Sequence, residues 1–124
     1  MTRKAPRSLI AALVLTAVTA PAFAQEVNVY SSRHYDSDDA LFNEFTNRTG
    51  ITVNRIEAKA DELIARIQAE GDNSPSDVLL TVDVGRVGRA DEAGILQSFS
   101  SDVINDRVPP HLRDPDDMWF GVSQ

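Results

Sequence analysis

The stretch "VNVYSSRHYDSDDALFNEFTNRTGITVNRIE", residues 27–57, decides the fold. It opens with Val27 and Val29 in a short apolar run typical of a strand. Apolar residues then recur at helical spacing from Leu41 to Phe45, until a glycine interrupts the pattern. The final residues alternate between apolar and polar side chains. This change of period predicts a strand, a helix and a second strand.

The residues that follow repeat this order. A helical pattern over 61–70 stops at Gly71, and a polar loop leads into "DVLLTVD", residues 77–83. That continuous apolar run is typical of a strand covered on both faces. A third helix is predicted over 86–93, ended by Gly94. The βαβαβα order predicts an α/β unit with a mostly parallel sheet and right-handed crossovers.

The pattern is looser towards the end of the chain. "SSDVINDRV" predicts a short helix capped by Ser101 and broken before Pro109, and "DPDD" predicts a turn. The apolar "MWFGV", residues 118–122, resembles the beginning of another strand. We expect Trp119 and Phe120 to fill the core.

The first 24 residues have the pattern of a secretory signal peptide. Three basic residues precede an apolar run, and a small-x-small triplet ends at Ala24. The apolar run, residues 9–18, is shorter than the roughly 20 residues that span a bilayer. We therefore predict a signal peptide over 1–24, cleavage near Ala24, and export to the periplasm.

Charge and cysteine content limit the partners. The leader holds three basic residues and no acid, so its removal changes 12 basic and 19 acidic residues to 9 and 19, a net charge of −10. This charge argues against nucleic acid, whose phosphates need clustered Lys and Arg. It favours a cation, or simply serves solubility. Because the sequence has no cysteine, a metal site must use oxygen and imidazole ligands.

Ligand-type side chains follow the predicted strands. His34 and Tyr35 come after the first strand, and Asp83 comes at the end of the third. Ligands of open α/β sheets bind at the carboxyl ends of strands, so these side chains would share one rim. Tyr35 and His34 are candidate metal ligands, and Arg33 is a candidate counter-charge or anion contact. The alternative is that His34 and Tyr35 are ordinary polar residues of a loop.

Other residues at or near this rim have ordinary roles open to them. Asp83 is a metal ligand, a partner of one, or the N-cap of the third helix, and the cap is the commoner role. Glu57 and Asp61 flank a strand-to-helix turn on the same rim, where they contribute to a cleft or, more commonly, to surface capping of the helix. We expect His111 to be exposed and Tyr30 to pack within or beside the first strand.

Three segments resemble a known family. "YSSRHYD" (30–36), "KADELIARIQAEGDNSPSDVLLTVDVGR" (59–86) and "LRDPDDMWFG" (112–121) are similar in order and spacing to the N-terminal part of periplasmic ferric iron-binding proteins. These are the substrate-binding components of Fe(III) ABC importers. The resemblance covers nearly all of the chain after the leader.

The resemblance implies a two-lobed protein that holds Fe(III) between its lobes. The first lobe supplies a His and a Tyr, which match His34 and Tyr35, and the second lobe supplies further tyrosines. Some members use a Glu after the third strand, but Val82 and Asp83 stand there, so no Glu ligand is carried over. We therefore expect residues 25–124 to be the N-terminal portion of the first lobe, truncated before the second.

The expected function is capture of ferric iron, with or without a synergistic anion, and its delivery by a monomer to an ABC permease. Two alternatives stay open at this point. One is a binding protein for an anion or organic solute, with Arg33, Arg86 and helix N-termini as contacts. The other is a small exported α/β enzyme that uses His34 with Asp36 or Asp83. The absence of a nucleophile motif makes us predict that the chain is not an enzyme.

Overall fold

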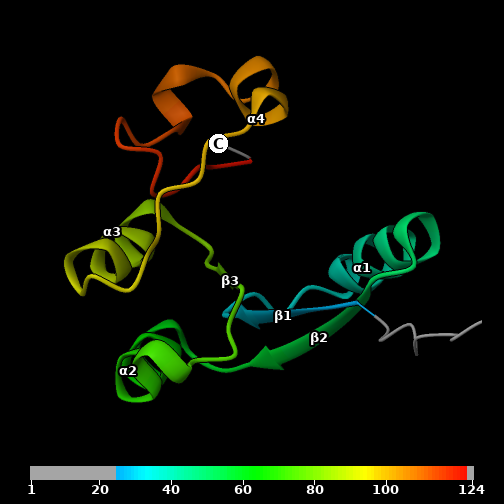
Figure 1. Ribbon diagram of the computed structural model, residues 1–124, viewed down its shortest axis with the longest axis horizontal. Helices are drawn as coiled ribbons and strands as arrows, with labels where there is room; N and C mark the ends of the chain where they lie inside the picture. Colours follow the sequence, from blue (N-terminus) through cyan, green and yellow to red (C-terminus); the bar gives the residue numbers. More distant parts are fainter. Residues whose placement is uncertain (1–24, 123–124) are drawn as a thin grey trace, which may run out of the picture.

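The computed structural model describes residues 25–122, so the predicted signal peptide lies outside the described part. Three strands alternate with helices in the first two thirds of the chain (Figure 1). The strands are β1 (Glu26–Ser31), β2 (Thr52–Glu57) and β3 (Val78–Leu80). The α-helices are α1 (Asp36–Thr49), α2 (Ala60–Glu70), α3 (Val84–Glu92) and α4 (Asp102–Arg107). Two short 3₁₀ helices are η1 (Gly71–Asn73) and η2 (Pro110–Leu112).

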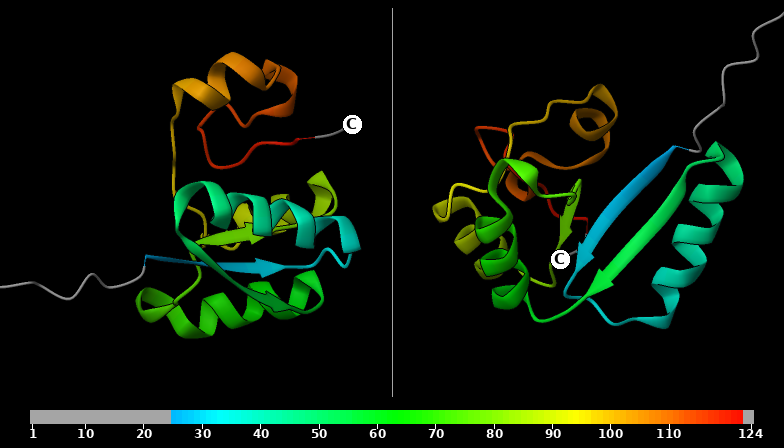
Figure 2. Two further views of the ribbon diagram at one scale, coloured as in Figure 1. Left: turned by 90° about the vertical axis from the view of Figure 1, so that its right-hand side faces the viewer. Right: turned by 60° about the horizontal axis from the view of Figure 1, so that its bottom comes forward.

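The three strands form one parallel sheet in the order β2-β1-β3. Ser31 at the end of β1 is paired with Glu57 on one side and with Leu80 on the other, so all three strands end at one edge. The crossover through α1 runs from β1 out to β2, and the crossover through α2 runs back past β1 to β3. Because both are right-handed and run in opposite directions, α1 and α2 cover opposite faces of the sheet (Figure 2). This arrangement confirms the predicted α/β class and parallel sheet.

The third strand differs from its prediction. It spans only Val78–Leu80 instead of residues 77–83, and it pairs on one side only, with β1. As an edge strand it leaves the side chain of Val78 44% exposed, and Val82 lies in the turn beyond it, 45% exposed. The prediction of a strand covered on both faces was wrong, because an apolar run alone does not distinguish a central strand from an edge strand.

The core is small and lies between β1 and the helices α2 and α3. Its buried apolar side chains are Val29, Tyr30, Ala60, Leu63, Ile64 and Ala90. Tyr30 is completely buried, as the sequence predicted, and its hydroxyl donates hydrogen bonds to both carboxylate oxygens of Glu70 at 3.1 Å. The polar end of this buried side chain is therefore satisfied.

Helix α1 is covered less well. It ends at Gly50 as predicted, where a left-handed φ of 73° suits glycine and the N–H donates to the carbonyl of Thr46. Leu41 is 61% exposed and Phe45 is 39% exposed. The third apolar residue of this face, Phe42, is half-buried beneath the guanidinium of Arg55.

The end of the chain confirms some predictions and corrects others. Helix α4 and the turn at residues 114–117 form where expected. Residues 118–122 do not form a strand, because their only ladder contact is one antiparallel bridge between Arg113 and Phe120. This segment lies apart from the sheet in Figure 1 and in the left view of Figure 2, and it does not extend the ladder of β3.

The aromatic pair in this segment does not fill the core as predicted. Trp119 is only half-buried, and Phe120 is 45% exposed. The bridge beside them joins Phe120 to Arg113 and not to a strand of the sheet. His111 is exposed, as expected. Among residues 25–122, no helix is long and apolar enough to cross a membrane.

Candidate metal centre

The candidate site lies at the carboxyl edge of the sheet. Because the strands are parallel, the loop after β1 and the last residue of β2 meet at this edge. The loop carries His34 and Tyr35, and β2 ends at Glu57. Tyr35 stands at the N-cap position of α1, where its carbonyl accepts a hydrogen bond from the N–H of Asp38 at 2.9 Å. The fold therefore presents both predicted ligands at the rim.

His34 lies against the end of the neighbouring strand. Its Nδ1 is 3.4 Å from Oε2 of Glu57, and its side chain is 58% exposed. The other carboxylate oxygen of Glu57 accepts from Nε of Arg55 at 2.9 Å. Within residues 25–122, Nε2 of His34 has no hydrogen-bond partner. Metal-binding histidines commonly present one ring nitrogen to the metal and the other to a carboxylate, and His34 has one ring nitrogen beside a carboxylate.

Tyr35 is also exposed, and an arginine covers its ring. The residue is 54% exposed, and the guanidinium carbon of Arg33 lies 5.0 Å from the ring centroid. Nη2 of Arg33 makes a 3.0 Å ion pair with Oδ1 of Asp38, a residue that is only 3% exposed. The tyrosine is thus held between a helix start and an anchored cation, with its ring accessible from solvent.

Asp83 has the role of a helix cap. Its Oδ1 accepts a 2.8 Å hydrogen bond from the N–H of Arg86, and its Oδ2 pairs with the guanidinium of the same residue. Asp61, on the same rim, pairs with Arg89 at 2.8 Å. Both carboxylates therefore bind arginines of α3, and neither contacts His34 or Tyr35.

The described residues do not complete a metal site. Within residues 25–122 no group of three or more His, Asp or Glu side chains is placed to hold a metal ion. At this rim the fold places one imidazole, one phenol and a carboxylate that lies beside the imidazole. Such a set fits a hard cation such as Fe(III), which prefers anionic oxygen ligands, but it fills only a minority of an octahedron.

The sequence placed Glu57 on the rim but missed its pairing with His34. Strand register carries the signal, because Glu57 aligns with Ser31 and a loop leaving β1 passes directly beside it. The anchoring of Arg33 by Asp38 was also missed. Asp38 lies in the first turn of α1, five positions after Arg33, so the arginine side chain can reach it. The sequence alone does not show that the carboxylate of Asp38 is buried.

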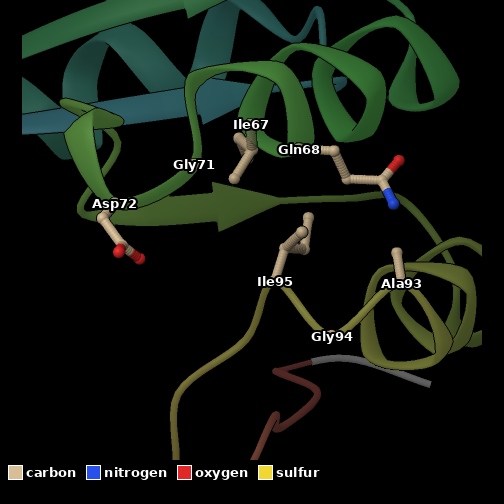
Figure 3. Close-up of a pocket in the computed structure, with 7 residues that line it drawn as sticks. All are labelled: Ile67, Gln68, Gly71, Asp72, Ala93, Gly94 and Ile95. Carbon is tan, nitrogen blue, oxygen red and sulfur yellow. The ribbon is translucent and has the colours of Figure 1, made fainter.

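A concavity lies away from this rim. A cavity of about 370 Å³ is lined by residues at the ends of α2 and α3, as Figure 3 shows. Its lining residues are Ile67, Gln68, Gly71, Asp72, Ala93, Gly94 and Ile95. The carboxylate of Asp72 is its one ionisable side chain, so it offers no acid–base pair.

The class of protein follows from comparison with known sequences. Residues 31–122 match the family of bacterial extracellular solute-binding proteins. The chain belongs to this family, whose members bind solutes outside the cytoplasm, and this supports the prediction of a binding protein over that of an enzyme. The matched residues include the whole candidate site.

Proteins similar to this chain include iron uptake and ferric iron-binding proteins. The chain is 56% identical over 104 residues to iron uptake protein A1 of Synechocystis sp., covering 84% of this chain and 29% of the relative. It is 34% identical over 100 residues to the major ferric iron-binding protein of Neisseria gonorrhoeae, covering 81% and 30%. These matches confirm the predicted similarity to ferric iron-binding proteins.

Solved structures of similar fold include proteins of the same kind. A Trichodesmium protein in complex with iron and citrate superposes with a TM-score of 0.75 at 57% identity, over 77% of this chain and 30% of that one. The ferric binding protein from Campylobacter jejuni gives 0.74 at 44% identity, over 76% and 30%. The chain therefore spans about a third of the length of these relatives, and its fold corresponds to part of a lobe.

Proposed function

We propose that this chain is the N-terminal portion, residues 25–124, of the first lobe of a periplasmic protein that captures ferric iron and delivers it to an ABC-type permease. His34 and Tyr35 are its ligands to the iron. The observation that carries the proposal is the pair of exposed ligand side chains at the carboxyl edge of the sheet, one of them backed by Glu57. The identity to iron uptake protein A1 supports iron as the solute.

Each residue has a specific part in this proposal. Nε2 of His34 donates its lone pair to the metal while Glu57 orients the ring from Nδ1. The phenol of Tyr35 loses its proton to Fe(III) and binds as phenolate, a hard anionic ligand. Further positions around the metal are taken by water, by a small anion such as carbonate, or by the second lobe of a longer protein.

The alternatives fit the contacts less well. Both arginines considered as anion contacts are engaged with carboxylates, Arg33 with Asp38 and Arg86 with Asp83. An acid–base pair of His34 with Asp83 is also not formed, since Asp83 caps α3 and the partner of His34 is Glu57. We propose a monomeric binding protein without enzymatic activity or affinity for nucleic acid.

Titration with ferric citrate tests the ligand assignment. Phenolate bound to Fe(III) gives a visible charge-transfer band, and the sequence has only two tyrosines, so the source of the band is decided by two variants. We expect Tyr35→Phe to abolish the band and Tyr30→Phe, which changes a buried ring, to preserve it. A band that survives Tyr35→Phe, or no band in the unchanged chain, would contradict the assignment.

Export has its own test. We propose that residues 1–24 are a signal peptide cleaved after Ala24. When the chain is expressed in a Gram-negative host, mass spectrometry of the periplasmic fraction should find a protein that begins at Gln25. An intact leader on protein retained in the cytoplasm would contradict both the cleavage and the location.

A further inference from the structure

We propose that Arg33 is a positioning residue for Tyr35, held in place by the buried carboxylate of Asp38. The inference rests on the proposed function, because it assigns Arg33 a task only if Tyr35 binds the ferric ion. It adds a residue that acts on the metal through its ligand and does not touch the metal itself.

The contacts form a chain from the interior to the site. Asp38 lies in the first turn of α1 with its side chain 5% exposed, and its Oδ1 pairs with Nη2 of Arg33 at 3.0 Å. The same guanidinium lies 5.0 Å from the centroid of the Tyr35 ring. The buried carboxylate therefore fixes the cation, and the planar cation covers one face of an otherwise exposed ring.

The backbone of Arg33 is fixed as well. Its N–H donates to Oγ of Ser31 at 3.1 Å, and the hydroxyl of this completely buried serine lies 3.2 Å from the carbonyl of Arg33. Both ends of the arginine are thus held by buried groups, whereas the phenol it covers has no side-chain hydrogen bond within residues 25–122. Within residues 25–122, the cation of Arg33 is therefore the polar or charged side chain that contacts the ring.

Stability alone gives little reason for this ion pair. Removing two charges from water is costly, and a buried pair is often no more stabilising than apolar side chains of similar volume. Here the pair is incomplete, because Nε of Arg33 and Oδ2 of Asp38 are buried without partners. A geometric task explains why two charges are kept so near an exposed aromatic ring.

The matched substitutions are Arg33→Lys and Arg66→Lys. Arg66 has the same kinds of contact, since it pairs with Glu70 at 2.7 Å and lies 5.1 Å from the ring of the other tyrosine, Tyr30. Lysine keeps the positive charge at either position but loses the planar group that covers the ring. The two variants therefore differ in which tyrosine they release.

Binding of ferric iron to the full chain, measured by competition with citrate, is the first readout. We expect Arg33→Lys to weaken binding about 10- to 100-fold, the range typical of residues that orient metal ligands, and to shift the charge-transfer band. Arg66→Lys should leave both unchanged. In the Tyr35→Phe background, Arg33→Lys should have no further effect, because its action passes through the phenol.

A second readout needs no metal. With isotopically labelled tyrosine, the NMR spectrum contains the ring signals of two residues, which Tyr30→Phe assigns. Arg33→Lys should move the ring signals of Tyr35 and leave those of Tyr30 in place, and Arg66→Lys should do the reverse. A general loss of structure would disturb both rings, so this measurement separates positioning from folding.

The double substitution Arg33→Met/Asp38→Leu removes both charges of the ion pair, so it leaves no unpaired carboxylate in the interior. We expect it to fold and to bind iron as weakly as Arg33→Lys. The proposal is overturned if either variant binds iron like the unchanged chain, or if Arg33→Lys is equally damaging in the Tyr35→Phe background. If Tyr35→Phe alone leaves iron binding and the band intact, the ligand assignment itself fails, and the role of Arg33 fails with it.

Discussion

The imidazole of His34 and the carboxylate of Glu57 lie side by side, with Nδ1 3.4 Å from Oε2. This contact joins the loop after β1 to the last residue of β2, two segments brought together only by the parallel register. At 3.4 Å the hydrogen bond is long, and a positive ion on Nε2 would strengthen it by making the N–H a better donor.

Glu57→Ala should therefore weaken ferric binding, by about tenfold or more, because the ring of His34 would lose the group that orients it. Competition with citrate measures the change. Glu62→Ala is the control, since Glu62 is exposed on α2 and has no partner within residues 25–122. Equal affinities for the two variants would show that Glu57 does not support the histidine.

Much of the fold was predictable because hydrophobic period and turn residues are local properties. The strand, helix and glycine order from Glu26 to Glu70 follows directly from them. The extent of β3 and the conformation of residues 118–122 depend on which segments pair as strands, and this pairing depends on the whole chain. An apolar run such as "VLLTV" looks the same at the edge of a sheet as at its centre.

The site was predictable to a smaller extent. The position of His34 and Tyr35 at the carboxyl edge follows from topology alone. Their immediate partners do not, because Glu57 meets His34 through strand register, and the arginine that covers Tyr35 is held by the buried carboxylate of Asp38. The choice of iron came from resemblance, since a lone His-Tyr pair in a polar loop is chemically ambiguous.

Asp83 gives a test that separates a helix cap from a metal ligand. Asp83→Ala should lower the free energy of unfolding by about 1 kcal/mol, because the N–H of Arg86 loses its acceptor at the start of α3. Asp83→Asn keeps a cap oxygen and should cost much less. Urea denaturation measures both. If Asp83 were a ligand, both variants would also lose iron, whereas we expect both to retain it.

The carboxylate of Glu70 should make stability fall in acid. Hydrogen bonds from Arg66, and then from Ser74, hold the pKa of Glu70 below its usual value of 4.5. Since the folded chain favours the ionised form, this contribution is complete above pH 4.5 and is lost as the pH falls through the lower folded-state pKa.

Urea midpoints measured across this range should decline, and Glu70→Gln should flatten the decline. Glu62→Gln, which changes an exposed carboxylate on the same helix, should leave the decline as it is. A slope unchanged by Glu70→Gln would place the acid sensitivity elsewhere in the chain.

Tyr30 should make stability fall in alkali, for the opposite reason. Burial, and then the hydrogen bond to Glu70, raises the pKa of its phenol above the usual value of 10.0. The folded chain therefore keeps a proton that the unfolded chain releases, so the stabilisation is complete below pH 10.0 and is lost as the pH rises towards the folded-state pKa.

Tyr30→Phe removes this titration and should flatten the alkaline limb of the urea midpoints, although it starts from a lower stability at neutral pH because Glu70 loses a donor. Tyr35→Phe, the same substitution on an exposed ring, should leave the alkaline limb unchanged, and a loss of that limb in Tyr35→Phe would contradict the assignment to the buried phenol.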